Sequence, residues 1–134
     1  MCFGTFDLLH LGHLEYFKQA RKYGDYLIVV IARDRTKRQQ NKKPLFSEKE
    51  RLRLIKNLKL VDEAVLGHPK NHFKIIIKHR PDVVCLGYDH TITEKKLRKE
   101  LGKYGLYPEI KRMKAHLPTK YKGGIIKKFI LQQV

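Results

Sequence analysis

The amino-acid sequence predicts an α/β fold built on a parallel sheet, and three features of the chain support this prediction. Apolar runs of strand length alternate with segments of helical periodicity, which is typical of βαβ units. The run over residues 26–32 is almost continuously apolar, as expected for a central parallel strand covered by helices on both faces. A turn that begins at Gly4 connects the first apolar run to the first helical segment. We expect residues 1–134 to form one domain with a single core.

Five runs are predicted as strands of the sheet: residues 1–3, 26–32, 63–66, 82–86 and 108–112. The first run has only about half the usual length of a strand. Either this strand is unusually short, or residues of the natural N-terminus precede this numbering.

Helical periodicity predicts helices that flank the sheet: residues 13–23, 47–58, 71–79, 94–104 and 123–133. Ser47 and Glu50 have the spacing of a capping box at the start of the second helix, because the serine can accept from the backbone while the glutamate reaches back. Thr91 and Glu94 have the same spacing before the fourth helix, so we expect them to cap it in the same way.

The composition indicates a folded protein, because 42% of the residues are hydrophobic and 32% are charged without low-complexity stretches. The longest apolar run is too short to cross a bilayer, and the N-terminal residues lack a secretory pattern. We therefore expect a cytoplasmic location. Cys2 and Cys85 stand far apart without metal-ligand spacing, so we expect two buried free thiols rather than a disulfide or a zinc site.

The chain is strongly basic, since 30 Lys and Arg residues against 13 Asp and Glu residues give a formal charge of +17. This charge raises the hypothesis of nucleic-acid binding. The basic residues are spread over every segment, however, and no nucleic-acid-binding motif accompanies them, so nucleic acid is not the expected partner. A basic surface that serves anionic small substrates explains the charge equally well. Lysine-rich surfaces also occur in proteins from hot habitats.

The segment GTFDLLHLGH, residues 4–13, carries the strongest functional indication in the chain. His10 and His13 are three residues apart and lie on one side of a predicted helix start. The N-terminus of a helix offers unpaired N–H groups and a positive dipole end, so two imidazoles beside it suit phosphate oxygens. Gly12 permits a close approach that a side chain would block. The segment therefore predicts a site for a nucleoside triphosphate.

This segment resembles the HxGH signature of the cytidylyltransferase-like nucleotidyltransferases, whose fold is a five-stranded parallel sheet of Rossmann type. Further stretches resemble the archaeal FAD synthases, which are FMN adenylyltransferases: ARDRTKRQQNKKP, LVDEAVLG, RPDVVCLGYDHT and LRKELGKYGL. The resemblance implies transfer of AMP from ATP to FMN, which gives FAD and pyrophosphate. Glycerol-3-phosphate cytidylyltransferase, with CTP as donor, is similar in the same places and is the closest alternative. A nucleotide- or nucleic-acid-binding protein that has lost catalysis is the alternative from another class.

The resemblance places six residues of the motif at the nucleotide: Thr5, Phe6, His10, Leu11, Gly12 and His13. The backbone of Thr5 and Phe6 is expected to lie against the triphosphate. His10 and His13 are the expected catalytic side chains, because they would donate hydrogen bonds to the phosphates as charge builds on the leaving group. Asp7 is expected either to orient one of these histidines or to serve a turn.

Three positions after the motif are also implied to contact the substrates. In relatives, the basic loop after the second strand holds a lysine that reaches the phosphates. Lys43 is the expected catalytic lysine and Lys42 the expected contact of the acceptor phosphate, with a solvated loop as the alternative for either. Asp89 follows a predicted parallel strand at the edge where ligands bind, and its carboxylate suits a ribose hydroxyl. His90 is expected in a surface turn.

The start of the last helix departs from the pattern of the relatives, which carry Ser or Thr pairs that touch the triphosphate. This chain has Gly123 and Gly124 there, so the contact would come from backbone N–H groups, with Thr119 as a substitute hydroxyl. Mg²⁺ is implied by the triphosphate, and we expect it to bind with the nucleotide because no carboxylate cage is visible. The resemblance also implies a homodimer.

Overall fold

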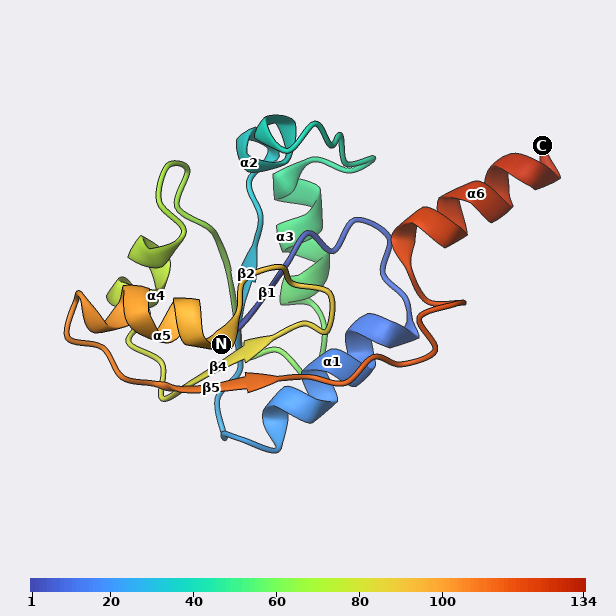
Figure 1. The fold of residues 1–134 in the computed structure, drawn as a ribbon. Helices are drawn as coiled ribbons and strands as arrows, with labels where there is room; N and C mark the ends of the chain where they lie inside the picture. Colours follow the sequence, from blue (N-terminus) through green and yellow to red (C-terminus); the bar gives the residue numbers. More distant parts are fainter.

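The structure is a computed structural model that describes residues 1–134. Five parallel strands form one sheet in the order β3-β2-β1-β4-β5 (Figure 1). The strands are β1 (Cys2–Gly4), β2 (Ile28–Ile31), β3 (Glu63–Leu66), β4 (Val83–Leu86) and β5 (Glu109–Arg112). This arrangement confirms the predicted α/β class with a five-stranded parallel sheet, in which β1 has three residues.

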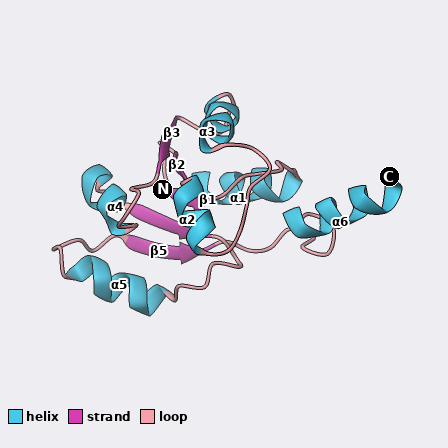
Figure 2. Cartoon of the chain, turned by 90° about the horizontal axis from the view of Figure 1, so that it is seen from above, coloured by secondary structure: helices cyan, strands magenta, loops and turns pink.

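The helices are α1 (Leu11–Arg21), α2 (Asp34–Gln39), α3 (Glu48–Lys56), α4 (Phe73–His79), α5 (Glu94–Gly102) and α6 (Gly123–Gln133). Residues alternate along the buried strand β2, so that Val29 and Ile31 face one side of the sheet and Val30 faces the other. On the first side they pack with Phe17 of α1 and Ile55 of α3. Helices α4 and α5 supply the core of the opposite side, so the sheet lies between two helical layers (Figure 2).

The capping pattern at Ser47 is confirmed, because its side chain accepts from the N–H of Glu50 at 3.3 Å. The expected cap at Thr91 is wrong. Thr93 caps α5 instead, with its hydroxyl accepting from the N–H of Lys96 at 3.1 Å. Thr91 and Thr93 are both hydroxyl residues, and Thr93 is the one that directly precedes the first helical residue, Glu94.

One further element differs from the sequence expectation, and the last helix, which has the predicted bounds, packs differently from the others. Helix α2 was not predicted, because its sequence DRTKRQ has no apolar periodicity and buries only Thr36. Helix α6 buries no residue at all, and both views show it projecting from the rest of the molecule (Figures 1 and 2). None of the helices has the length and apolar character needed to cross a membrane.

Candidate functional site

A cleft of about 1210 Å³ lies across the carboxyl ends of the strands. The chain runs from β1 outward to β2 and β3 and then returns to place β4 on the other side of β1. In open parallel sheets, ligands bind at such a reversal of strand order, outside the carboxyl ends of the two central strands. The cleft is lined by residues of the β1–α1 turn, the β4–α5 loop, the β2–α2 region and the start of α6.

The turn after β1 is shaped by Gly4 and Phe6. Phe6 is buried with a left-handed backbone (φ 55°), and its ring covers Gly4 so closely that a Cβ there would lie 2.6 Å from the ring. The Phe6 ring also packs edge-on against His13 and tilted against Phe17, both at 5.3 Å between centroids. The turn therefore presents its backbone, together with Thr5, to the cleft.

The two histidines lie together at the start of α1. His10 is the N-cap residue, and its N–H donates to Nδ1 of His13 at 3.3 Å. The rings stack with their centroids 3.8 Å apart, and a Cβ on Gly12 would lie 2.8 Å from the His10 ring, so glycine leaves the room this arrangement requires. Both side chains line the cleft, whereas that of Leu11 is half exposed and does not.

The surroundings of the two histidines favour their neutral forms. Burial, and then the proximity of His10, lower the pKa of His13 to about 4, although Asp89 acts in the opposite direction. Burial also lowers the pKa of His10. A neutral His13 that accepts on Nδ1 carries its proton on Nε2, which is then a donor. Nδ1 of His10 is buried without a hydrogen-bond partner in the protein.

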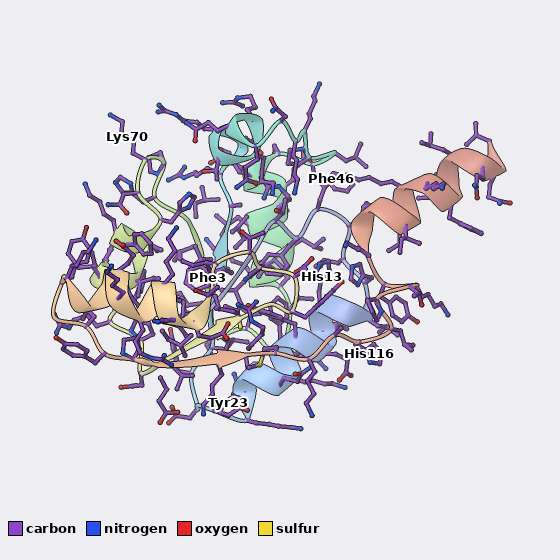
Figure 3. All side chains as sticks on the ribbon, in the orientation of Figure 1. Phe3, His13, Tyr23, Phe46, Lys70 and His116 are labelled. Atoms are coloured by element: carbon purple, nitrogen blue, oxygen red, sulfur yellow. The ribbon has the colours of Figure 1, made fainter.

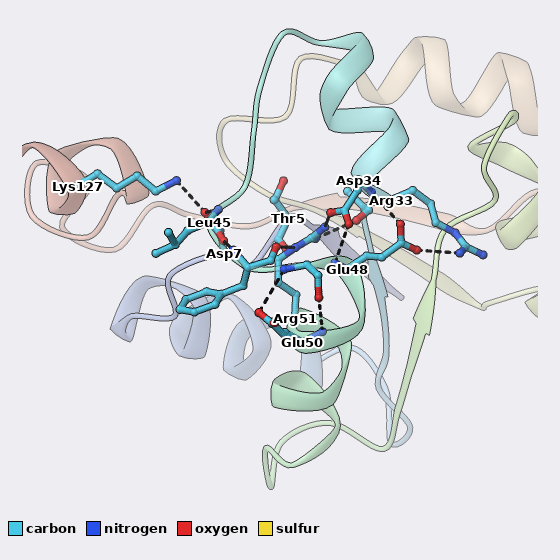
Figure 4. A network of polar contacts seen from close by, with 12 residues as sticks. Thr5, Asp7, Arg33, Asp34, Leu45, Glu48, Glu50, Arg51 and Lys127 are labelled. Carbon is cyan, nitrogen blue, oxygen red and sulfur yellow. Dashed lines mark hydrogen bonds and ion pairs between the residues drawn. The ribbon is translucent and has the colours of Figure 1, made fainter.

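Arg51 of α3 fixes the backbone around the turn (Figure 4). Its side chain is fully buried and donates to the carbonyl oxygens of Thr5, Ala32 and Phe46 at 2.8, 2.9 and 3.0 Å. The guanidinium also pairs with Asp34 at 2.6 Å. One cation thus ties together the ends of β1 and β2 and the loop that precedes α3.

Asp7 does not orient a histidine, which corrects one of its two expected roles. Its carboxylate accepts from the N–H groups of Leu45 and Phe46 at 2.8 and 2.9 Å and from Lys127 of α6 at 2.7 Å (Figure 4). Burial alone would raise the pKa of Asp7, but the bonds from Lys127 and the two N–H groups lower it on balance. Asp7 therefore tethers the basic loop and α6 to the motif.

The cations of the cleft come from the region after β2. Lys42 and Lys43 are exposed and line the cleft, in the place expected for them. Lys37 of α2 was not singled out from the sequence, yet it is half-buried in the same cleft and bonds only Gln40, at 3.0 Å. Burial, followed by Lys42 and Arg51, lowers the pKa of Lys37, although Asp89 favours its charge.

The loop after β4 carries Asp89, which is exposed and lines the cleft. Arg112 of β5 holds this loop by donating to the carbonyl oxygens of Gly87, His90 and Ile92 at 2.9, 2.9 and 2.7 Å. His90 lies at the end of the expected turn, where its N–H donates to the oxygen of Gly87 at 3.2 Å. Its ring is partly buried, and its Nδ1 accepts from the N–H of Gly87 at 3.0 Å. Burial lowers the pKa of His90.

The segment before α6 closes the histidine side of the cleft. Tyr121 stacks between His10 and His116, with centroid distances of 5.9 and 5.7 Å. Figure 3 shows His116 on the segment that leads to α6. Gly123 and Gly124 line the cleft at the start of α6, and no atom lies within 4 Å of a Cβ built on either. Thr119 does not line the cleft.

These features define a Rossmann-like nucleotidyltransferase, and comparison with known proteins agrees. The model of the cytidylyltransferase-like family matches residues 1–129, so the chain belongs to that family. FAD synthases of three archaea are similar to it. That of Thermoplasma volcanium is 44% identical over 93% of the chain and 84% of the relative. That of Thermoplasma acidophilum is 37% identical over 100% of the chain and 94% of the relative. That of Methanohalophilus mahii is 44% identical over 97% of the chain and 92% of the relative.

A solved structure supports the fold. A lipopolysaccharide core biosynthesis protein from Thermoplasma volcanium is 45% identical and superimposes with a TM-score of 0.85, covering 87% of this chain and 95% of that protein. The comparisons confirm the resemblance that the HxGH segment and the four further stretches predict.

Proposed function

We propose that the protein is an FMN adenylyltransferase, which transfers AMP from ATP to FMN and releases pyrophosphate. The observation that carries this proposal is the similarity to FAD synthases along nearly the whole chain, at 37–44% identity. The cleft is consistent with it, because stacked neutral histidines, a helix start and several lysines face one another across the strand ends.

In the proposed reaction, a phosphate oxygen of FMN attacks the α-phosphorus of ATP, the bond to the β-phosphate breaks, and pyrophosphate leaves. Nε2–H of His13 and the imidazole of His10 donate to phosphate oxygens, where they stabilise the charge that builds on the leaving group. The backbone of Thr5 and Phe6 and the N–H groups at Gly123 hold the triphosphate. No proton needs to leave the attacking phosphate, so catalysis consists of positioning and charge stabilisation.

The remaining site residues receive roles in the same proposal. Lys43 faces the phosphates as a catalytic cation, Lys42 binds the phosphate of FMN, and the carboxylate of Asp89 binds a ribose hydroxyl. No group of three or more His, Cys, Asp or Glu side chains in the structure could hold a metal ion. We therefore write the donor substrate as the Mg²⁺ complex of ATP, with the ion bound to the phosphates.

Two expectations about the setting belong to this proposal. We expect the reaction to take place in the cytoplasm. A homodimer is supported by apolar and aromatic side chains around α1 that remain exposed, namely Leu11, Tyr23 and Tyr26. Sedimentation at several protein concentrations tests the homodimer, and a monomer across the whole range would contradict it.

A substrate matrix tests the reaction. ATP or CTP is combined with FMN, glycerol 3-phosphate or phosphopantetheine in the presence of Mg²⁺, pyrophosphate release is followed, and the products are separated by chromatography. FAD formed only from ATP and FMN is the expected result. Pyrophosphate from CTP and glycerol 3-phosphate would assign the protein to the other branch. Nucleotide binding without any product would indicate that the glycines at the start of α6 have cost catalysis.

A further inference from the structure

The cleft includes an apolar hollow on the face of the sheet that α4 and α5 cover. Val30 of β2 and Leu86 of β4 line it from the sheet, and Ile76 of α4 and Leu97 of α5 line it from the two helices. These four side chains are buried in one cluster, with 3–4% of their surface exposed. None of them can form a hydrogen bond, so this part of the cleft suits an apolar part of a ligand.

Phe73 adds an aromatic ring to the hollow. It is the first residue of α4, it is partly buried, and it packs against the same apolar cluster while lining the cleft. Ile92, from the loop before α5, does the same. An aromatic ring among aliphatic side chains suits a flat aromatic ligand, because stacking of the rings adds to the burial of apolar surface.

His68 supplies one hydrogen-bond donor near the start of α4. It follows β3 and lines the cleft, and its Nδ1 accepts from the N–H groups of Lys70 and Asn71 at 3.2 and 3.0 Å. An imidazole that accepts on Nδ1 carries its proton on Nε2. Nε2 of His68 has no partner in the protein, so it is free to donate to an oxygen atom of a ligand.

The end of β3 is joined to the cationic region after β2. Arg33 donates to the carbonyl oxygen of Gly67, the residue before His68, at 2.7 Å. Lys37 and Lys42 follow Arg33 and line the same cleft. A ligand whose phosphate lies at these lysines therefore has its other end on the side of the cleft that carries His68 and α4.

We propose that this hollow binds the isoalloxazine ring of FMN and that Phe73 stacks on the ring. The inference rests on the proposed function, because it takes FMN as the acceptor and Lys42 as the contact of its phosphate. The dimethylbenzene end of the flavin is apolar and lies among the aliphatic side chains between α4 and α5. A carbonyl oxygen at the other end of the ring accepts from Nε2 of His68.

Adenine fits the hollow less well than the flavin. Its amino group and ring nitrogens are distributed around the whole base, and burial of such groups against aliphatic side chains costs free energy unless they are hydrogen-bonded. The cleft has a volume of about 1210 Å³, which exceeds the usual range for one small ligand. It therefore has room for ATP beside an FMN whose ring occupies the hollow.

Riboflavin tests the ring site separately from the phosphate site, because it has the flavin ring and no phosphate. Phe73→Leu keeps an apolar side chain and removes the aromatic ring. We expect it to raise the Kd of riboflavin and of FMN about three- to tenfold, as for the loss of an aromatic pair, and to leave the Kd of ATP unchanged. Quenching of flavin fluorescence measures the first two constants, and calorimetry measures the third.

A second variant and a control accompany Phe73→Leu. His68→Asn keeps an oxygen that can accept from the N–H groups of the turn and removes Nε2, so riboflavin binding should weaken about threefold. Ile77 lies on the same helix as Phe73 and packs against the same cluster, but it does not line the cleft. Ile77→Ala should therefore lower Tm without changing the Kd of riboflavin.

The outcomes separate this inference from the proposed function. If Phe73→Leu weakens ATP binding and leaves riboflavin binding unchanged, adenine occupies the hollow and the inference is overturned. Wild-type Kd values for both ligands in this variant would overturn it as well, and FAD formation by the wild type would still support the proposed function. Riboflavin binding that depends on Phe73, in a protein that forms no FAD, would support the inference and contradict the proposed function.

Discussion

The rings of His10 and His13 stack with their centroids 3.8 Å apart and their planes 24° from parallel. Burial is the main cause of the low pKa of His13, and the proximity of His10 adds to it because two imidazolium cations at this distance would repel each other. The pair is therefore neutral at neutral pH before a ligand arrives. A bound triphosphate would place negative charge beside the two neutral rings. Hydrogen bonds donated by the rings would then stabilise that charge.

Removal of either ring should cripple turnover and leave the fold intact. We expect His10→Ala and His13→Ala each to lower kcat by about 100-fold, because each deletes one donor at the developing charge. The measurement is pyrophosphate release, with far-UV circular dichroism to confirm the fold. His79→Ala on α4 is the matched control, since that histidine does not line the cleft. A near-normal rate in either cleft variant would contradict the proposal that the two histidines bind the phosphates.

The depressed histidine pKa values make stability depend on pH in a defined window. In the unfolded chain His13 binds a proton near pH 6.5, and in the folded protein only near pH 4, so between these values the unfolded state holds more protons. His10 and His90 shift in the same direction. The free energy of unfolding should therefore fall as pH is lowered from about 6.5 to 4.

Urea unfolding across this range measures the effect. His13→Gln removes the titrating group, so the slope of stability against pH should become smaller in that variant. An unchanged slope would mean that His13 titrates normally in the folded protein.

Arg51 should be among the most costly residues to replace. Arg51→Met leaves Asp34 and three carbonyl oxygens without their donor. Because Asp34 is 27% exposed, we expect a cost of about 3 kcal/mol, at the lower end of the range for a broken buried pair. Urea unfolding should show this loss, and ATP affinity should fall with it because the oxygen of Thr5 is no longer held. Arg53→Met, on the exposed side of the same helix, should change stability by no more than about 0.5 kcal/mol.

The sheet could be predicted from the sequence because buried parallel strands are continuous apolar runs, and residues 26–32 contain β2 for that reason. Helix α2 could not, because a short polar helix leaves no periodic signal and is held by Thr36 and by contacts of its first residue, Asp34, with α3. The last helix was predicted in its full extent from its own residues. That this helix buries no residue depends on the tertiary structure, so the sequence of the helix alone does not predict it.

The same distinction applies to the site. The position of His10, Gly12 and His13 at the cleft could be predicted because it depends on a local helix start. Tyr16 and Arg112 could not, because each acts on backbone groups of other elements that only the folded sheet brings within reach. The turn that ends at His90 has a local signal, but the partial burial of the His90 ring has none, because Arg112 and Tyr16 approach His90 only in the fold.

Lys37 should contribute to the binding of phosphates. It is the half-buried lysine of the cleft without an anionic partner within bonding distance, and a bound phosphate would supply one. We expect Lys37→Gln to raise the KM of ATP or FMN about tenfold and Lys37→Arg to restore part of the loss. Arg38→Gln, its exposed neighbour on α2, is the control and should leave both KM values unchanged. Wild-type KM values in Lys37→Gln would show that this lysine does not contribute to the binding of phosphates.

The ion pair between Asp7 and Lys127 should couple the position of α6 to the binding of ATP. The pair is 2.7 Å long and links the HxGH segment to a helix that is otherwise exposed. Because the side chain of Lys127 is 42% exposed, a double-mutant cycle with Asp7→Asn and Lys127→Met should give a coupling of only about 0.5–1 kcal/mol in stability.

The effect on ATP should be larger than the effect on stability. Loss of the pair frees the start of α6, where Gly123 is proposed to contact the triphosphate, so we expect Lys127→Met to weaken ATP binding about three- to tenfold. The weakening should shrink at high salt, because the wild-type pair is screened there. Lys128→Met removes the adjacent charge, which has no such partner, and should leave ATP affinity near the wild-type value. Equal losses in the two variants would show that general basicity, rather than the tether, governs binding at this end of the cleft.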